Sequence, residues 1–182
     1  MSFQAKQKQK FDDLKVALHM NNRTQLKRDA NGGNTVLFIY PPKEEDQYIK
    51  KAKELYPEVY FIDIGQLFVS YIDTVGWDDF KEFYQAYETT PDQVFKNDDE
   101  HNLFTLIRTE IQTAAEKDRI PFVIRTGALH GTGIANQHVM EDSVVLGLKQ
   151  PVVFFYPGKI EKGELLFLNF KPASKYRCKI VQ

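Results

Sequence analysis

Four short runs of apolar, β-branched and aromatic residues constrain this chain more than any other feature. They are residues 35–40 (TVLFIY), 59–64 (VYFIDI), 121–125 (PFVIR) and 152–156 (VVFFY). A continuous run of this kind is typical of a strand that helices cover on both faces. Because segments with helical periodicity separate the runs, the sequence predicts right-handed β-α-β units and a three-layer α/β domain with a mainly parallel sheet.

The rest of the chain is expected to form helices and a few late strands. Apolar residues recur at helical spacing in residues 11–18, 43–56, 67–75, 78–87, 103–115 and 137–148. Residues 163–170 and 176–181 have strand composition, and this late pair can add an antiparallel edge to the sheet. Pro157 and Gly158 are expected to close the fourth apolar strand.

The length and charge of the chain limit its function classes. Its 182 residues suffice for one domain with a core. We predict a single α/β domain over residues 11–182, preceded by a flexible N-terminus over residues 1–10, which are polar and rich in Gln and Lys. The 24 Lys and Arg nearly balance 25 Asp and Glu. A dedicated nucleic-acid binder usually carries a basic stripe, so direct nucleic-acid binding is not expected.

Cysteine content and hydropathy indicate a compartment. The single cysteine, Cys178, excludes a disulfide within the chain and fits a reducing cytosol. No apolar run approaches the roughly 20 residues that a membrane helix needs. The first ten residues have no apolar core of a targeting segment. We therefore expect a cytoplasmic protein that does not enter the membrane.

Polar residues and glycines gather where the predicted strands end. In an open α/β sheet, ligands bind at the carboxyl ends of the strands. The candidates for a ligand or partner loop are Asp63, Arg125, Thr126, Gly127, His130, Gly131 and Gly133. The three glycines follow a strand and precede a predicted helix, as in an anion cradle. The alternative, a plain turn with glycines at positive φ, is the commoner use of such a loop.

The residues that known catalytic and cofactor motifs require do not occur in the sequence. Pro41 and Pro42 follow the first strand and lack the N–H donors of a phosphate-binding loop. There is no Gly-x-Ser-x-Gly elbow, and no histidine pair has the spacing of a zinc site. Asp63 is the best lone acid, although such a carboxylate is more often a turn or cap residue. The sequence assigns no catalytic residue, metal or cofactor, and we do not expect an enzyme.

Two tyrosines stand out as candidate contact residues. Tyr40 and Tyr156 each precede a proline at the end of a predicted strand. The strand ends are expected to lie at one edge of the sheet, where a partner could reach both side chains. Packing in the core is the alternative, and the apolar runs that contain the two tyrosines favour it.

Several segments in a fixed order resemble the BrxB family of bacteriophage-exclusion (BREX) defence systems. They are FIYPPKEE at 38–45, IDI at 62–64, VIRTG at 123–127, PVVFFYPG at 151–158 and the closing Tyr176-Arg177. The helix start FDDL at 11–14 is also similar, so the resemblance spans nearly the whole chain. The segment LHGTG at 129–133 departs from the family's pattern.

The resemblance implies an NTPase-like α/β topology without a phosphate loop. It also implies a cytoplasmic accessory protein encoded beside a methyltransferase, a large ATPase and a phosphatase-like protein. No catalytic residues are carried over. The first functional hypothesis is thus a non-catalytic component of an antiviral defence complex, with protein–protein interaction toward the phosphatase-like component. The second is a small nucleotide- or phosphate-binding protein or enzyme that uses the strand-end loops.

Overall fold

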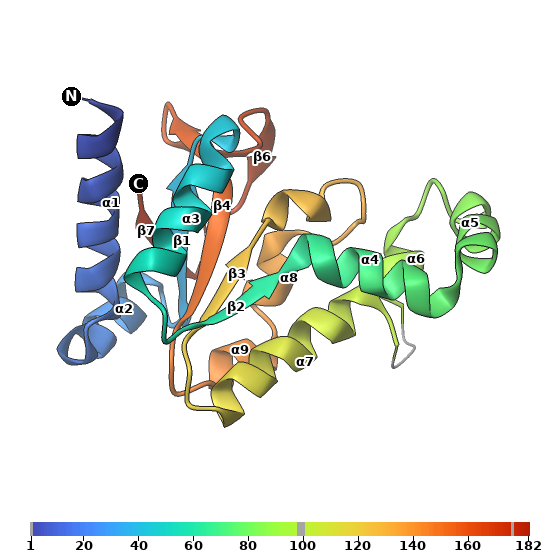
Figure 1. Cartoon of the computed structure of the whole chain (residues 1–182), viewed down its shortest axis with the longest axis horizontal. Helices are drawn as coiled ribbons and strands as arrows, with labels where there is room; N and C mark the ends of the chain where they lie inside the picture. The colour runs from blue at the N-terminus through green and yellow to red at the C-terminus, as the bar shows by residue number, and fades with distance from the viewer. Residues whose placement is uncertain (1, 98–100, 176) are drawn as a thin grey trace.

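Five parallel strands form the central sheet, in the order β2-β3-β4-β1-β7 (Figure 1). The computed structural model describes residues 2–97, 101–175 and 177–182. The parallel strands are β1 (Thr35–Tyr40), β2 (Tyr60–Asp63), β3 (Pro121–Ile124), β4 (Val152–Glu161) and β7 (Cys178–Val181). The first strand lies inside the sheet, between β4 and β7, as in doubly wound folds. The predicted mainly parallel α/β sheet is confirmed.

Helices cover both faces of the sheet because successive strand residues point to opposite faces. Along β1, Val36, Phe38 and Tyr40 belong to one core, whereas Leu37 and Ile39 belong to the other. The first core is covered by α1 (Phe3–Leu18), α2 (Arg23–Asp29) and α3 (Glu45–Leu55). The second contains residues of α4 (Ile64–Val75), α5 (Trp77–Ala86), α6 (Asp92–Phe95), α7 (Leu103–Glu116), α8 (Asn136–Met140) and α9 (Ser143–Gly147). Short 3-10 turns are η1 (Met20–Asn22), η2 (Pro42–Glu44) and η3 (Thr126–Leu129).

Helix α1 begins earlier than the sequence pattern predicts. Residues 3–10, assigned above to a flexible N-terminus, are helical. Ser2 caps the helix by accepting a hydrogen bond from the N–H of Ala5 at 3.3 Å. The ring of Phe3 packs edge-on against Tyr48, with centroids 6.1 Å apart. Burial of the Phe11 side chain later in the helix contributes about 1.5–3 kcal/mol to the stability of the fold. Tertiary contacts therefore hold α1 in place, although the polar composition of its first turns does not indicate them.

The short helices depart most from the predictions. The segment 137–148, expected as one helix, forms α8 and α9, because Asp142 interrupts it and caps α9 by accepting from the N–H of Val144 at 2.9 Å. Helix α6 lies between the predicted helices 78–87 and 103–115, and its Val94 and Phe95 are buried. Helix α2, whose segment has no clear periodicity, is anchored by the buried Leu26.

Strand β4 continues past the expected end at Pro157 and Gly158. Its last four residues pair with β5 (Glu164–Phe167), which pairs in turn with β6 (Lys171–Ala173), and both pairings are antiparallel. Pro157 lacks an N–H, but its carbonyl accepts from the N–H of Leu168 at 2.8 Å. A Cβ at Gly158 would lie 2.3 Å from the carbonyl oxygen of Leu166, so only glycine lets the hairpin fold back here.

The late strands therefore differ in part from the expectation. Antiparallel strands exist, but they are β5 and β6 within residues 164–173, and they pair with the extension of the internal strand β4 and not with an edge strand. Strand β7 joins an edge of the sheet, parallel to β1. Tyr176, part of the closing motif of the resemblance, lies outside the described residues. The two edges of the sheet are thus occupied by β2 and β7.

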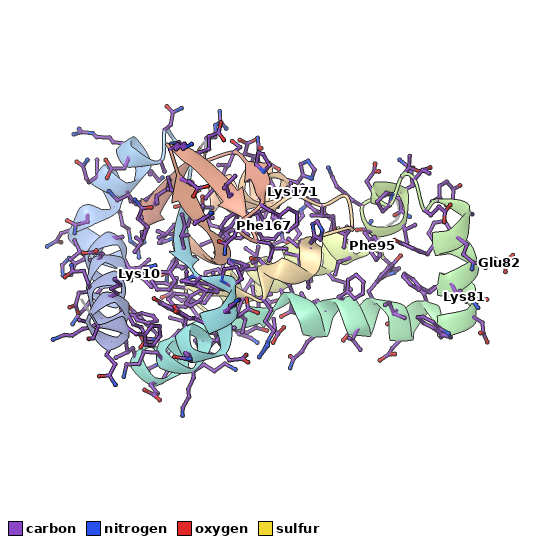
Figure 2. All side chains as sticks on the ribbon, turned by 90° about the horizontal axis from the view of Figure 1, so that it is seen from above. Lys10, Lys81, Glu82, Phe95, Phe167 and Lys171 are labelled. Atoms are coloured by element: carbon purple, nitrogen blue, oxygen red, sulfur yellow. The ribbon has the colours of Figure 1, made fainter. Side chains whose placement is uncertain are left out.

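An arm projects from one side of the sheet (Figures 1 and 2). Helix α4 leads away from the end of β2, α5 lies across the far end, and α7 returns toward β3 (Figure 1). Lys81 and Glu82 mark the far end of the arm, whereas Lys10 of α1 lies on the opposite side of the molecule (Figure 2). The arm is the part of the chain that extends furthest from the central sheet.

Candidate functional site

Arg125 connects the ends of β2 and β3 to α3. It follows β3 in the left-handed conformation, with φ 55°. Its Nε donates to Oδ2 of Asp63 at 3.0 Å, and its Nη2 lies 3.5 Å from Oδ1 of Asp46. The other carboxylate oxygen of Asp63 accepts from the N–H of Gln66 at 3.2 Å and caps α4. Asp63 is therefore both a helix cap and the ion-pair partner of Arg125.

This ion-pair cluster has little capacity left for a charged ligand. Two carboxylates face the guanidinium of Arg125, whose side chain is 41% exposed. Their charges offset the positive charge that would attract a phosphate. An exposed ion pair of this kind contributes only about 0–1 kcal/mol to stability. The sequence thus places Asp63 and Arg125 together, but it does not show that they neutralise each other.

The glycine loop packs against the protein instead of opening outward. Thr126 is buried, and its Oγ1 donates to the carbonyl of Phe155 at 2.7 Å. Within residues 125–132, the N–H groups of Ala128, His130 and Thr132 donate to carbonyls three residues earlier. A Cβ on Gly127 would touch the side chains of Leu168 and Pro157. These backbone N–H groups, which an anion cradle would direct at a ligand, are instead used in hydrogen bonds within the turn. This is the arrangement expected of a plain turn.

The distal end of the loop lies away from the ion-pair cluster. His130 is exposed, and its ring packs edge-on against Phe170, with centroids 5.5 Å apart. Gly131 has φ 87° and nothing near the position of a Cβ. Gly133, with φ 76°, contacts the backbone of Asp92 at the start of α6. The candidate residues thus form two groups, one around Arg125 and one against α6 and the β5–β6 hairpin.

Tyr40 and Tyr156 are buried on opposite faces of the sheet. Tyr40 is 0% exposed, and its hydroxyl donates to Oε2 of Glu45 at 2.6 Å. Tyr156 is 2% exposed, and its ring lies 5.1 Å from that of Phe167. Burial raises the pKa of both tyrosines well above the ordinary value of 10.0, so both hydroxyls stay protonated. Both side chains are packed in the core of this chain, which is the alternative weighed above.

A lysine that the sequence does not single out lies at the end of β1. The Nζ of Lys10 donates to the carbonyl of Ile39 at 2.9 Å and lies 5.6 Å from the ring centre of Tyr48. Burial lowers the pKa of Lys10 below 10.5. The spacing of Lys10 in the sequence could have indicated that it is partly buried, because Lys10 lies one helical turn before Leu14 on the buried face of α1.

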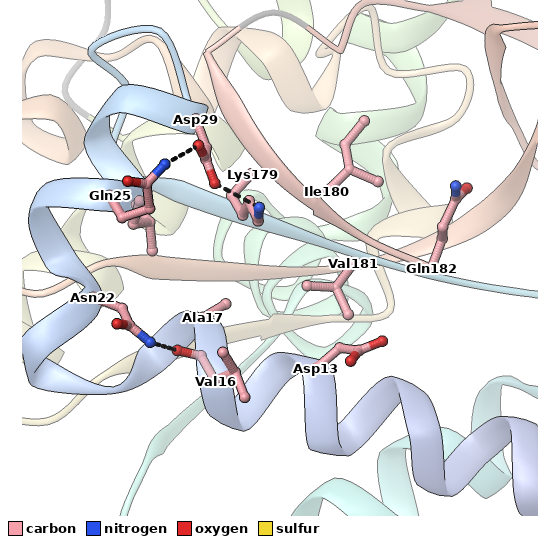
Figure 3. A pocket seen from close by; sticks show the side chains of 11 residues that line it. Asp13, Val16, Ala17, Asn22, Gln25, Asp29, Lys179, Ile180, Val181 and Gln182 are labelled. Carbon is pink, nitrogen blue, oxygen red and sulfur yellow. Dashed lines mark hydrogen bonds and ion pairs between the residues drawn. The ribbon is translucent and has the colours of Figure 1, made fainter.

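A groove lies between α1, α2 and the edge strand β7 (Figure 3). Its volume is about 520 Å³. Lys179 donates to Oδ2 of Asp29 at 2.6 Å, and Gln25 donates to Oδ1 of the same residue at 2.7 Å (Figure 3). These hydrogen bonds, led by that of Lys179, lower the pKa of Asp29. Within the groove, Lys179 and Asp29 are therefore paired with each other.

Exposed apolar side chains are concentrated on the arm. Trp77, Val69 and Tyr87 are 64%, 55% and 40% exposed. They account for half of the six large apolar residues that are exposed in the described part of the chain. Trp77 stacks on Phe80, with ring centroids 6.2 Å apart, and Phe80 in turn packs against Phe95 at 5.9 Å. The buried aromatic rings therefore hold the exposed indole of Trp77 in a fixed position, where a partner protein can contact it.

Among the described residues, no three His, Cys, Asp or Glu side chains come together in a way that could hold a metal ion. None of the helices described has the length and hydropathy needed to cross a membrane.

Comparison of the chain with protein-family models, with curated proteins and with solved structures finds no match.

Proposed function

We propose that this chain is a non-catalytic, cytoplasmic accessory component of an antiviral phage-exclusion complex, and that it acts by binding a phosphatase-like partner protein. The observation that carries the proposal is the projecting arm with its exposed Trp77, Val69 and Tyr87. The identity of the partner is drawn from the resemblance to the BrxB family.

The arm has the properties of a preformed binding surface. Helices α4, α5 and α6 are joined by buried aromatic rings, and the hydroxyl of Tyr71 in α4 donates to the carbonyl of Val94 in α6 at 2.7 Å. A surface held in this way loses little conformational entropy when a partner binds. Trp77 is the side-chain type that most often dominates binding energy at protein interfaces.

The strand ends support the nucleotide- or phosphate-binding alternative less well. Asp63 and Arg125 pair with each other, and Thr126 donates to the carbonyl of Phe155. Each of these polar side chains already has a partner within the chain. A phosphate would have to displace the carboxylates around Arg125, at a cost in electrostatic energy.

The test is an affinity pull-down of the tagged protein from cells that carry its own gene cluster, at moderate and at high salt. We expect the phosphatase-like protein in stoichiometric amount. We also expect its retention at high salt, because salt weakens an interface of charges but not one of apolar groups. The variants Trp77→Gln and Val69→Ser should reduce recovery at least about tenfold, a loss of roughly 1.4 kcal/mol.

Val16→Ser is the matched control. Val16 is a valine on a helix surface like Val69, and it is 62% exposed, but it lies on α1, on the opposite side of the molecule from the arm. Recovery with Val16→Ser should equal that of the unmodified chain. Loss of the partner in all three variants, or recovery of the chain alone, would contradict the proposal. If nucleotide or phosphate raises the melting temperature of the unmodified chain but not that of Arg125→Ala, the result would favour the nucleotide- or phosphate-binding alternative instead.

A further inference from the structure

A basic pocket lies where strands β1 and β4 begin. Its volume is about 600 Å³, inside the range of roughly 300–1,000 Å³ that is typical of small-molecule sites. Helix α2 contributes to its lining, and so do Lys149 and Pro151, which come just before β4. Leu26 and Pro151 are buried and give the lining an apolar part. The basic pocket therefore lies at the opposite ends of the strands from Arg125 and the glycine loop.

Every charged side chain that lines the basic pocket is a cation. The four are Arg23, Lys27 and Arg28 of α2 together with Lys149. None of them forms an ion pair among the described residues, although the whole chain has 24 basic and 25 acidic residues. Positive charges that line one pocket without a carboxylate attract an anion to it.

Contacts within the protein maintain this excess of positive charge. Nη1 of Arg23 donates to the carbonyl of Lys149 at 2.9 Å, so Arg23 joins α2 to the segment before β4. Asp29 is the only acidic residue of α2, and it lines the groove beside β7 instead of the basic pocket. There it accepts hydrogen bonds from Lys179 and Gln25 (Figure 3). The acidic residue of α2 is thus held away from the four cations.

The dipole of α2 accounts for only part of the charge pattern. A helix dipole stabilises cations in the last turn, and Lys27 and Arg28 lie there. Arg23 is the first residue of α2, where the dipole disfavours a cation. Lys149 lies outside the helices. A bound anion would account for all four cations.

We propose that the basic pocket binds a compact phosphate compound with several negative charges, of the size of pyrophosphate or a nucleoside triphosphate. Arginine side chains form paired hydrogen bonds with phosphate oxygens, and lysine side chains add point charges. The four cations line one pocket and do not form a stripe along the surface, which favours a compact anion over a nucleic-acid backbone. The site is separate from the arm, so it does not depend on the function proposed above.

The experiment is isothermal titration calorimetry of the full chain with inorganic pyrophosphate, ATP and a short single-stranded DNA, at low and at physiological salt. At least one of the two small anions should bind, and more weakly at the higher salt, because salt screens exposed charges. The double variant Lys27→Gln/Lys149→Gln should weaken this binding at least about tenfold, because it removes two of the four positive charges. Tighter binding of ATP identifies a nucleotide ligand, whereas equal or tighter binding of pyrophosphate identifies the phosphate groups alone.

Lys50→Gln/Lys171→Gln is the matched control. It makes the same substitutions at exposed lysines of α3 and β6, with the same change in net charge, and should leave the affinity unchanged within about twofold. The proposal is overturned if neither small anion binds, if the DNA binds more tightly than both, or if the control weakens binding as much as Lys27→Gln/Lys149→Gln does. Binding that is lost in Arg125→Ala but kept in Lys27→Gln/Lys149→Gln would place the anion at the strand ends, and this result also overturns it.

Discussion

A pair of glycine substitutions tests whether the glycine loop is a packed structural turn. Gly131 and Gly133 both have left-handed backbones, with φ 87° and 76°. They differ in the space around them. A Cβ at Gly131 would meet nothing within 4 Å, whereas one at Gly133 would lie 2.7 Å from the backbone nitrogen of Asp92. Alanine at either site therefore pays for the left-handed conformation, but only alanine at Gly133 also collides with α6.

The difference between the two variants can be estimated. The left-handed conformation costs a residue with a Cβ about 1–2 kcal/mol. Overpacking against a fixed backbone adds about 1–3 kcal/mol. Gly131→Ala should thus lower the free energy of unfolding by about 1–2 kcal/mol and Gly133→Ala by about 2–5 kcal/mol. For a domain of this length, the difference corresponds to a melting temperature of Gly133→Ala that is roughly 2–12 °C below that of Gly131→Ala.

Urea unfolding followed by far-ultraviolet circular dichroism measures both free energies, provided that the two variants keep the same m-value. Equal losses in the two variants would refute the packing of the loop against α6, because the left-handed backbone is common to both. A loop that opens to receive an anion would give that equal result. The comparison thus also bears on the choice between a cradle and a turn.

Four further experiments test the strand ends and the thiol. Tyr40→Phe should lower the free energy of unfolding by about 1.5–3 kcal/mol, measured in urea, because its hydroxyl donates to the carboxylate of Glu45. Thr126→Val keeps the shape of the side chain but removes the hydroxyl that donates to the carbonyl of Phe155. It should lower the free energy of unfolding by about 1–3 kcal/mol in the same assay. An unchanged free energy would mean that this hydrogen bond contributes nothing to stability. Burial raises the pKa of Cys178 to about 11, so iodoacetamide at pH 8 should modify the folded chain more than about a hundredfold more slowly than the unfolded chain. Because the pKa of Cys178 in the folded chain exceeds the ordinary 9.0, the buried, protonated thiol contributes fully to the free energy of unfolding below pH 9. This contribution decreases by up to about 2.7 kcal/mol as the pH rises toward 11. Cys178→Ala should reduce this dependence of stability on pH.

The sequence predicts the sheet well because its strands are buried on both faces. Residues 35–40 are β-branched, apolar or aromatic without interruption, and the structure buries every one of them. The beginning of α1 could not be predicted in the same way. Its first turns are polar, and they are held by a cap from Ser2, a ring contact of Phe3 and a hydrogen bond from Lys10 to Ile39. Tyr48 and Ile39, the partners of Phe3 and Lys10, are distant in sequence, so local composition does not report these two contacts.

The candidate site could be predicted only as a set of positions. The rule that strand ends meet at one edge brings Asp63 and Arg125 together, and the structure joins them at 3.0 Å. The rule does not give the direction of each side chain. Tyr40 and Tyr156 share the sequence context of a strand end before proline, yet they belong to opposite cores.

Trp77 is the only tryptophan of the chain, and it is 64% exposed at the junction of α4 and α5. Its indole therefore acts as a built-in fluorophore for the arm. Emission from the free protein should lie near that of indole in water and should change little on unfolding, so fluorescence is a poor probe of stability here. A shift of the emission to shorter wavelength would instead report the moment at which another molecule covers the arm, without any attached dye.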